Sequence, residues 1–173
     1  MNDNAMRKIR ISKVVINIGT GSDEQMHGSA KRRIEAITNK KPANSLSRKR
    51  NPSFKIVKGQ KIGAFVTIRG NEAKKLLSRL FDAVNNKIKY SSITNNSLSF
   101  GIAEYIDING IKYDPKIGML GMDVNVSFKR NGLRVALRKI RNSSIPERHR
   151  IIPKEEILEY INKEFGVTTI EAS

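Results

Sequence analysis

The segment between Lys61 and Lys87 constrains the fold most strongly, because a strand pattern passes directly into a helix pattern. Residues 61–70 read KIGAFVTIRG, with apolar side chains at every second position. Residues 71–87 then place apolar side chains three and four positions apart, with Asn71 predicted as the N-cap. This pairing predicts a sheet with one buried face and a helix packed on it. The alternation assigns Ile62, Ala64, Val66 and Ile68 to the buried face, and Phe65, Thr67 and Arg69 to the other face.

Residues 133–141, LRVALRKIR, are expected to form the second strand of a hairpin. They follow a turn at Asn131 and Gly132, and they would bury Leu133, Val135 and Leu137 while exposing Arg134 and Arg138. Further strands are expected over 10–19, 100–108 and 122–130, short extended pieces over 43–57, a loop over 109–121, and helices over 22–40 and 152–166.

No tandem repeat is visible, and this order of elements indicates an α+β fold. It suits a mainly antiparallel sheet with helices packed on one face, which leaves the opposite face free to bind. With 173 residues and 38% apolar content, the chain can bury a core as one domain, with two small lobes as the alternative. We expect one domain over 1–173, with an N-terminal half over 7–90 and a C-terminal half over 91–170.

Cysteine is absent, which excludes disulfides, thiolate metal sites and cysteine nucleophiles. The N-terminus lacks an apolar signal region, and no apolar run approaches the ~20 residues of a membrane helix. A cytosolic protein without a membrane partner is therefore the expectation.

The charge of the chain is large and uneven. The formal net charge is +17, and the 36 residues from Ala36 to Asn71 contain nine cations and no acid. A second basic stretch, Lys129 to Arg150, contains eight cations and one acid, Glu147. Solvated surfaces usually mix both signs, so the distribution favours a nucleic acid, whose phosphates release counterions on binding, over a merely solvated face.

Structured RNA is a better candidate than DNA for the partner of these basic segments. Patterns typical of helix-turn-helix, zinc-finger and basic-zipper proteins are absent, and aromatic residues make up only 6% of the chain. Phe65 on the free sheet face could stack on a base, although a half-buried packing role is favoured for it.

Signals of catalysis are weak. The GTG turn at residues 19–21 has acids where a phosphate-binding loop would need glycine or lysine. Asp107, Asp114 and Asp123 lack a metal-binding spacing, and His27 and His149 have no recognisable nucleophile with an orienting acid. We therefore predict no catalytic residues, no metal and no cofactor.

Five segments in order resemble the ribosomal protein L5 family of the large subunit, in its archaeal and eukaryotic form. They are KVVINIGTG, ITNKKP, SFKIVKGQKIGAFVTIRG, FGIAEYIDI and IKYDPKIGMLGMDVNV, within a match from about Arg7 to Phe165. The resemblance implies a ferredoxin-like or RRM-like sheet with extended basic loops. It implies a structural protein that binds 5S rRNA in the central protuberance; an independent basic RNA-binding, DNA-binding or chaperone protein is the alternative.

The same resemblance implies which residues contact RNA. Lys13, Asn17, Lys40, Thr67 and Arg69 would contact 5S rRNA, with Lys40 standing where the family commonly has glutamine, so that an amide contact becomes a donor-only one. Other large-subunit rRNA contacts are expected at Arg48, Lys49, Arg50, Arg134 and Arg138.

The segment over 52–62 would be an extended loop that reaches the P-site tRNA. Its candidate residues are Phe54, Lys55, Lys58, Gly59 and Lys61, with Gly59 allowing a sharp turn and Phe54 anchoring the base of the loop. In the loop over 109–121, Lys112, Tyr113, Lys116 and Gly118 are candidates for the bridge to the small-subunit S13 family. The L18 family is a further expected partner, and a eukaryotic member would pass through the nucleolus.

Overall fold

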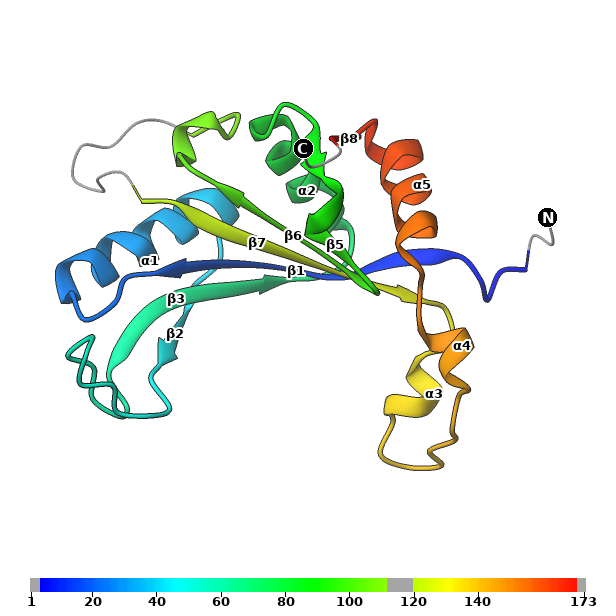
Figure 1. Cartoon of the computed structure of the whole chain (residues 1–173), viewed down its shortest axis with the longest axis horizontal. Coiled ribbons are helices and arrows are strands. Elements are labelled where there is room, and N and C mark those ends of the chain that lie inside the picture. Colours follow the sequence, from blue (N-terminus) through cyan, green and yellow to red (C-terminus); the bar gives the residue numbers. More distant parts are fainter. Residues whose placement is uncertain (1–3, 112–119, 171–173) are drawn as a thin grey trace.

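A six-stranded antiparallel sheet forms the centre of the protein, shown in Figure 1 as a computed structural model that describes residues 4–111 and 120–170. The strand order is β2-β3-β1-β7-β6-β5. The chain order of the strands therefore differs from their order in space, with β1 and β7 at the centre. The bounds are β1 Ile9–Gly19, β2 Ala43–Leu46, β3 Lys61–Ile68, β5 Ile93–Thr94, β6 Ser97–Ile102 and β7 Met122–Arg130.

Three helices cover one face of this sheet: α1 (Glu24–Thr38), α2 (Asn71–Ala83) and α5 (Lys154–Phe165). The Asp23 side chain caps α1 by accepting from the backbone N–H of Gln25 at 2.9 Å. Gly166 ends α5 in the left-handed conformation, as the sequence indicates. Phe81 of α2 packs between Phe100 and Phe165, with ring centroids 5.4 and 5.2 Å away. This helix layer confirms the expected α+β architecture.

The strands bury alternate residues, as the sequence predicts. Ala64, Val66 and Ile68 of β3 are buried beneath the helices, whereas Phe65 and Thr67 on the other face are half-buried. The same alternation runs along β1 and β7, where the buried residues are Val14, Ile16, Ile18, Met122, Val124, Val126 and Phe128. We call the side without helices the open face.

Two projections extend beyond the sheet on the side away from the helices (Figure 1). The first, the loop leg, comprises residues 47–60 between β2 and β3. The second, the helical leg, comprises residues 131–151 and holds the short helices α3 (Arg134–Leu137) and α4 (Glu147–Arg150). A parallel pair of β4 (Lys87–Lys89) and β8 (Thr168–Ile170), and the 3-10 turns η1 (Tyr90–Ser92) and η2 (Tyr105–Asp107), complete the structure.

The predicted hairpin after β7 is wrong, because both edges of β7 are occupied. β7 pairs with β1 as far as Arg130 opposite Ile9, and with β6 on its other edge. Along Met122–Ser127 a returning strand would find both edges of β7 taken, and the chain instead turns at Gly132 and forms α3. Leu137, expected in the core, is 74% exposed.

Two smaller expectations also need correction. The strand predicted over 100–108 starts earlier and ends at Ile102, because its partner strand begins opposite at Met122 and offers no further ladder. The N-cap of α2 is Gly70 rather than Asn71. The chain leaves β3 with φ of 74° at Gly70, a backbone conformation that asparagine adopts less readily than glycine.

Candidate nucleic-acid interface

The open face carries hydrogen-bonding side chains in rows across neighbouring strands. Asn17 of β1 lies opposite Phe65 of β3 and Asp123 of β7. The next row places Val15 between Thr67 and Asn125. Because residues opposite each other in a ladder share a face, these amide, hydroxyl and carboxylate groups form one polar surface. Amide and hydroxyl groups can both donate to and accept from base edges or ribose, whereas the carboxylate only accepts and lysine only donates.

Asn17 and Thr67, predicted from the resemblance as RNA contacts, are brought close together on this surface. Lys13 joins them at the next open-face position of β1, where it pairs with Ser127 just after a register irregularity. Arg69 follows the last residue of β3 and is exposed beside Gly70, at a hollow also lined by Arg10 and Lys129. Of these four predicted residues, Lys13 and Asn17 lie on β1, Thr67 lies on the adjacent β3, and Arg69 follows the end of β3.

Lys40 is not part of this group. It lies on the helix side, beyond the end of α1, where its Nζ pairs with the Glu72 carboxylate at the start of α2. Both side chains are partly exposed, and the pair therefore adds little to stability. An RNA contact by Lys40 would have to come from a different segment of RNA than the one on the open face.

The loop leg is an ordered extension of the β2–β3 hairpin. Ser47 N donates to Gln60 O and Gly59 N donates to Ser47 O, both at 2.9 Å, and Asn51 and Ile56 form a further bridge. Gly59 has φ of 84°, which confirms the predicted sharp turn. The cations predicted in this segment, Arg48, Lys49, Arg50, Lys55, Lys58 and Lys61, are exposed.

The role expected for Phe54 as an anchor of the loop base is wrong. Phe54 is 68% exposed and lies in the turn between Asn51 and Ile56, which is the outer end of the leg. The backbone hydrogen bonds at Ser47 hold the base of the loop instead. An exposed ring at the end of a cationic loop is available to stack on a base.

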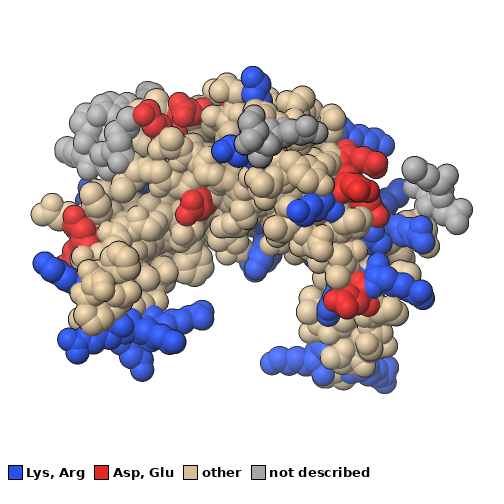
Figure 2. All heavy atoms as spheres, viewed as in Figure 1, with Lys and Arg blue, Asp and Glu red and all other residues tan. Residues whose placement is uncertain are grey.

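The helical leg provides the second concentration of cations. Arg134 and Arg138 are exposed, and Arg138 Nε donates to the backbone oxygen of Arg141 at 2.7 Å. Figure 2 shows Lys and Arg side chains at the outer ends of both legs, with a hollow between the legs beneath the sheet. The arrangement suits an anionic chain that lies in the hollow, with phosphates at both legs and base or sugar edges on the polar face.

The predicted bridge residues Lys112, Tyr113, Lys116 and Gly118 lie outside the described residues. The described residues on both sides of that segment are held by arginines. Arg79 of α2 donates from Nε and Nη2 to Asn109 O at 3.1 and 2.7 Å. Arg33 of α1 donates from Nη1 to Leu120 O.

Arg33 is a structurally important residue that sequence reasoning missed. It is fully buried, and its guanidinium lies over the Tyr105 ring at 4.4 Å from the centroid. Met26 stands in the apolar spacing of the helix predicted over 22–40, yet it is 46% exposed, whereas Arg33 lies inside. A charged residue carries no core signal in an apolar pattern, and two partners of Arg33, the Tyr105 ring and the Leu120 backbone oxygen, lie 72 and 87 positions away in the sequence.

The displaced pKa values belong to groups on the helix side. Burial lowers the pKa of the Arg33 guanidinium, and Tyr105 partly opposes this. Burial raises the pKa of the Tyr160 phenol, and Glu164 adds to the rise. A hydrogen bond to Glu164 raises the pKa of the Lys74 ammonium. The first two shifts reflect burial, and the third reflects an ion pair between α2 and α5.

Two kinds of feature are absent from the part of the chain that the structure describes. No group of His, Asp or Glu among residues 4–111 and 120–170 could hold a metal ion. In the same part of the chain, no helix combines the length and apolarity that a bilayer crossing requires. A polar sheet face between two cationic legs defines the class instead, that of a nucleic-acid-binding protein.

Comparison with known proteins identifies the family. Residues 4–56 match the family described as ribosomal protein L5, and residues 61–160 match the model of the C-terminus of the same ribosomal family. A large ribosomal subunit protein uL5 from Sulfurisphaera tokodaii is 40% identical over 169 residues, which cover 97% of this chain and 96% of the relative. Those from Methanosphaera stadtmanae and Nanoarchaeum equitans are 42% and 41% identical, covering 95% and 97% of this chain and 98% and 99% of the relatives.

The chain therefore belongs to the ribosomal protein L5 family, uL5. This confirms the family inferred from the five sequence segments, and these relatives are archaeal, as the resemblance indicates. The family is one of ribosomal structural proteins, which confirms that the chain is not an enzyme.

Proposed function

We propose that this protein is a structural constituent of the large ribosomal subunit that binds 5S rRNA on its open face. The observation that carries the proposal is the polar face between two cationic legs. Phosphate contacts position an RNA, whereas contacts to base and sugar edges select it. The legs supply the first kind of contact, and Asn17, Thr67 and Asn125 supply the second.

Arg69 is the residue on which the 5S assignment can be tested most directly. Its guanidinium offers five donors in a planar fork, and its place at the end of β3 lies beside the polar rows. If Arg69 contacts a base, Arg69→Ala weakens 5S rRNA binding by about 1–3 kcal/mol in gel-shift titrations. Arg32→Ala is the matched control, because Arg32 is exposed on α1 on the helix side. If Arg69→Ala and Arg32→Ala bind 5S rRNA with equal affinity, Arg69 does not contact 5S rRNA.

The loop leg is proposed to contact the P-site tRNA. Lys55 and Lys58 are exposed, and Phe54 at the outer end can stack on an unpaired base. A surface that depends on phosphates and stacking tolerates different sequences, which suits a partner that changes in every elongation cycle.

A short replacement of the loop leg separates this contact from 5S binding. Because Ser47 and Gly59 are hydrogen-bonded, residues 48–58 can be replaced by an Asn-Gly turn that closes the hairpin. Reconstituted subunits with this variant are expected to keep 5S rRNA and to lose retention of P-site tRNA in filter binding. If the variant subunits lose 5S rRNA instead, the loop leg contacts 5S rRNA rather than the P-site tRNA.

We also propose that the segment over 109–121 contributes to the bridge with the small-subunit S13 family, and that the L18 family lies nearby on 5S rRNA. The hydrogen bonds from Arg79 to Asn109 O and from Arg33 to Leu120 O support this role, because a segment that contacts another subunit must be held at both ends. Sedimentation in high salt tests the ribosomal assignment as a whole. The protein is expected to remain with the large subunit, and recovery only in the free pool would favour an independent nucleic-acid chaperone.

A further inference from the structure

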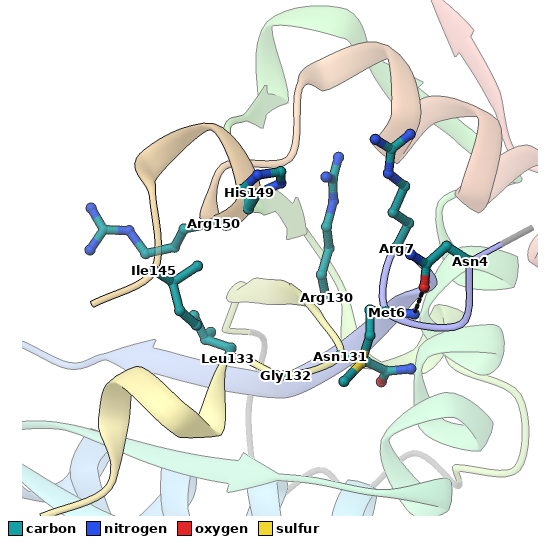
Figure 3. A pocket seen from close by; sticks show the side chains of 10 residues that line it. All are labelled: Asn4, Met6, Arg7, Arg130, Asn131, Gly132, Leu133, Ile145, His149 and Arg150. Atoms are coloured by element: carbon teal, nitrogen blue, oxygen red, sulfur yellow. Dashed lines mark hydrogen bonds between the residues drawn. The ribbon is translucent and has the colours of Figure 1, made fainter. Parts of the chain in front are cut away.

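A second cationic site lies at the base of the helical leg, away from the open face. A hollow of about 290 Å³ opens there between the N-terminal segment, the end of β7 and α4 (Figure 3). It adjoins a larger hollow of about 850 Å³ that continues to α5. Arg7, Arg130 and His149 line both hollows and therefore form the wall that the two share.

Arg130 is the most informative residue of this site. Strand alternation places it on the helix side, opposite to its neighbour Lys129, and its side chain is only 13% exposed. Its Nη2 donates to Glu156 Oε2 at 2.6 Å, but its Nε is buried without a hydrogen-bond partner among the described residues. A buried, unpaired donor on a charged group is costly, which points to an acceptor supplied from outside.

The surroundings of Arg130 favour an anion. The two hollows are lined by five cations, Arg7, Arg130, Arg148, Arg150 and Lys163, and by two acids, Glu156 and Glu159. In Figure 3 the side chains of Arg7 and Arg130 extend in the same direction, and the imidazole ring of His149 turns toward Arg130. Glu156 neutralises only part of this charge.

The other lining residues favour a base beside that anion. Met6, Leu133 and Ile145 give the smaller hollow an apolar portion, next to the polar Asn4 and Asn131. Asn131 Nδ2 donates to Ala5 O at 2.7 Å and so fixes the N-terminal segment against the leg. The volume of the smaller hollow lies close to the lower end of the range of ligand sites, about 300–1,000 Å³, and that of the larger hollow lies within it.

We propose that this site binds one unstacked nucleotide of a ribosomal RNA loop. Its phosphate lies on Arg7, Arg130 and His149, and its base packs on Met6, Leu133 and Ile145. Sequence-specific RNA recognition targets loops whose bases can leave the stack, and apolar and planar cationic side chains receive them. The inference rests on the proposed function, because the RNA is that of the large subunit. Since Lys129 and Arg130 point to opposite sides of β7, the nucleotide belongs to a different RNA segment from that on the open face.

The absence of cysteine from the chain permits a direct test. Ser144→Cys places a thiol next to Ile145, and Ser99→Cys places one on the open face; both serines are exposed. Each single-cysteine protein is labelled with benzophenone maleimide, assembled into large subunits and irradiated. The Ser144 probe is expected to crosslink to an RNA loop that the Ser99 probe does not reach. Adding Arg7→Gln and His149→Gln is expected to abolish the Ser144 crosslink while leaving the Ser99 crosslink.

The outcomes separate this site from the proposed function. An RNA crosslink from Ser99 alone, or a Ser144 crosslink to protein, would overturn the second site and leave the open face intact. RNA crosslinks from neither probe would count against the ribosomal RNA function itself. In a salt titration of RNA binding, Arg7→Gln is expected to lower the slope of log affinity against log salt by about one. The control Arg32→Gln is expected to leave that slope unchanged, and equal slopes for both variants would contradict a phosphate contact at Arg7.

Discussion

The two legs present similar chemistry on different scaffolds. The loop leg extends two paired strands, and backbone hydrogen bonds at Ser47, Asn51 and Ile56 continue the hairpin into it. The helical leg follows β7, which is already paired with β1 and β6, so it is held by local turns, by a bond from Ser143 N to Val135 O at 3.3 Å and by the bond from Asn131 Nδ2 to Ala5 O. The loop leg is therefore ordered by hydrogen bonds that continue those of the sheet, whereas the helical leg depends mainly on hydrogen bonds between its own residues.

The outer parts of both legs nevertheless converge in composition. Phe54 and Val57 are exposed among the cations of the loop leg, and Leu137 and Ile140 are exposed among those of the helical leg. Apolar groups next to cations suit RNA, because phosphates and base faces lie side by side along the chain. The difference between the legs is therefore one of support rather than of binding chemistry, and it can be tested by substitutions at their bases.

The largest effect is expected at Gly63, which lies at the base of the loop leg. A Cβ at this position would meet Ile18 O at 2.6 Å, so β1 and β3 could not pair closely there. We expect Gly63→Val to lower the free energy of unfolding by about 3 kcal/mol, measured by urea denaturation.

Gly101→Val in β6 is the matched control for this substitution. A Cβ at Gly101 would come no closer than 3.9 Å, to Met122 O, and the residue is exposed. Valine suits a strand, so little change in stability is expected. Equal losses for the two variants would show that the close approach of β1 to Gly63 is not what requires glycine.

Part of this fold could be predicted from the sequence, and part could not. Alternation in residues 61–70 and 122–130 identified the strands and their buried faces, because burial on one side imposes a period of two. The resemblance indicated Asn17 and Thr67, which the β1–β3 register brings together. Alternation could not show that β6 already occupies the second edge of β7 along Met122–Ser127, since pairing is a property of the whole sheet; it therefore predicts a strand over 133–141 that the sheet does not contain.

The helix-side site was beyond the reach of pattern reasoning for a related reason. Arg7, Arg130 and His149 are far apart in sequence and meet only where the N-terminal segment, β7 and α4 converge. Arg33 was missed because its burial depends on Tyr105, a partner that no local period reveals. Long-range pairing, rather than local propensity, determines both arrangements.

An intermediate effect is expected from one glycine in each leg. Gly59 and Gly132 have φ of 84° and 85°, so alanine at either position incurs a left-handed penalty of about 1–2 kcal/mol. In native-state hydrogen exchange, Gly59→Ala is expected to reduce protection of the Ser47 amide by a factor of about 5–30. Gly132→Ala should do the same for the Val135 amide, which donates to Gly132 O at 3.0 Å. Protection lost across the whole sheet in either variant would contradict independent legs.

A smaller, pH-dependent effect is expected beside the base of the helical leg. Tyr160 packs edge-on against Phe128 with centroids 5.9 Å apart, and burial raises the pKa of its phenol above 10.0. The folded state thus holds the proton more tightly than the unfolded state, so the contribution is complete below pH 10 and is lost as pH rises further. Stability should fall more steeply between pH 9 and 11 in the wild type than in Tyr160→Phe. Parallel curves would contradict the raised pKa.

The smallest effect is expected at Leu137, and its smallness is informative. If residues 133–141 formed a strand with Leu137 in the core, Leu137→Ala would cost about 2–5 kcal/mol. In the helical leg Leu137 is 74% exposed, so the loss should stay within about 0.5 kcal/mol. Leu98→Ala in β6 serves as the buried control, since Leu98 is fully inaccessible and its truncation leaves a cavity. If the two leucines cost the same in thermal and urea unfolding, the helical leg packs against the body more closely than the exposure of Leu137 indicates, and the contrast between the legs fails.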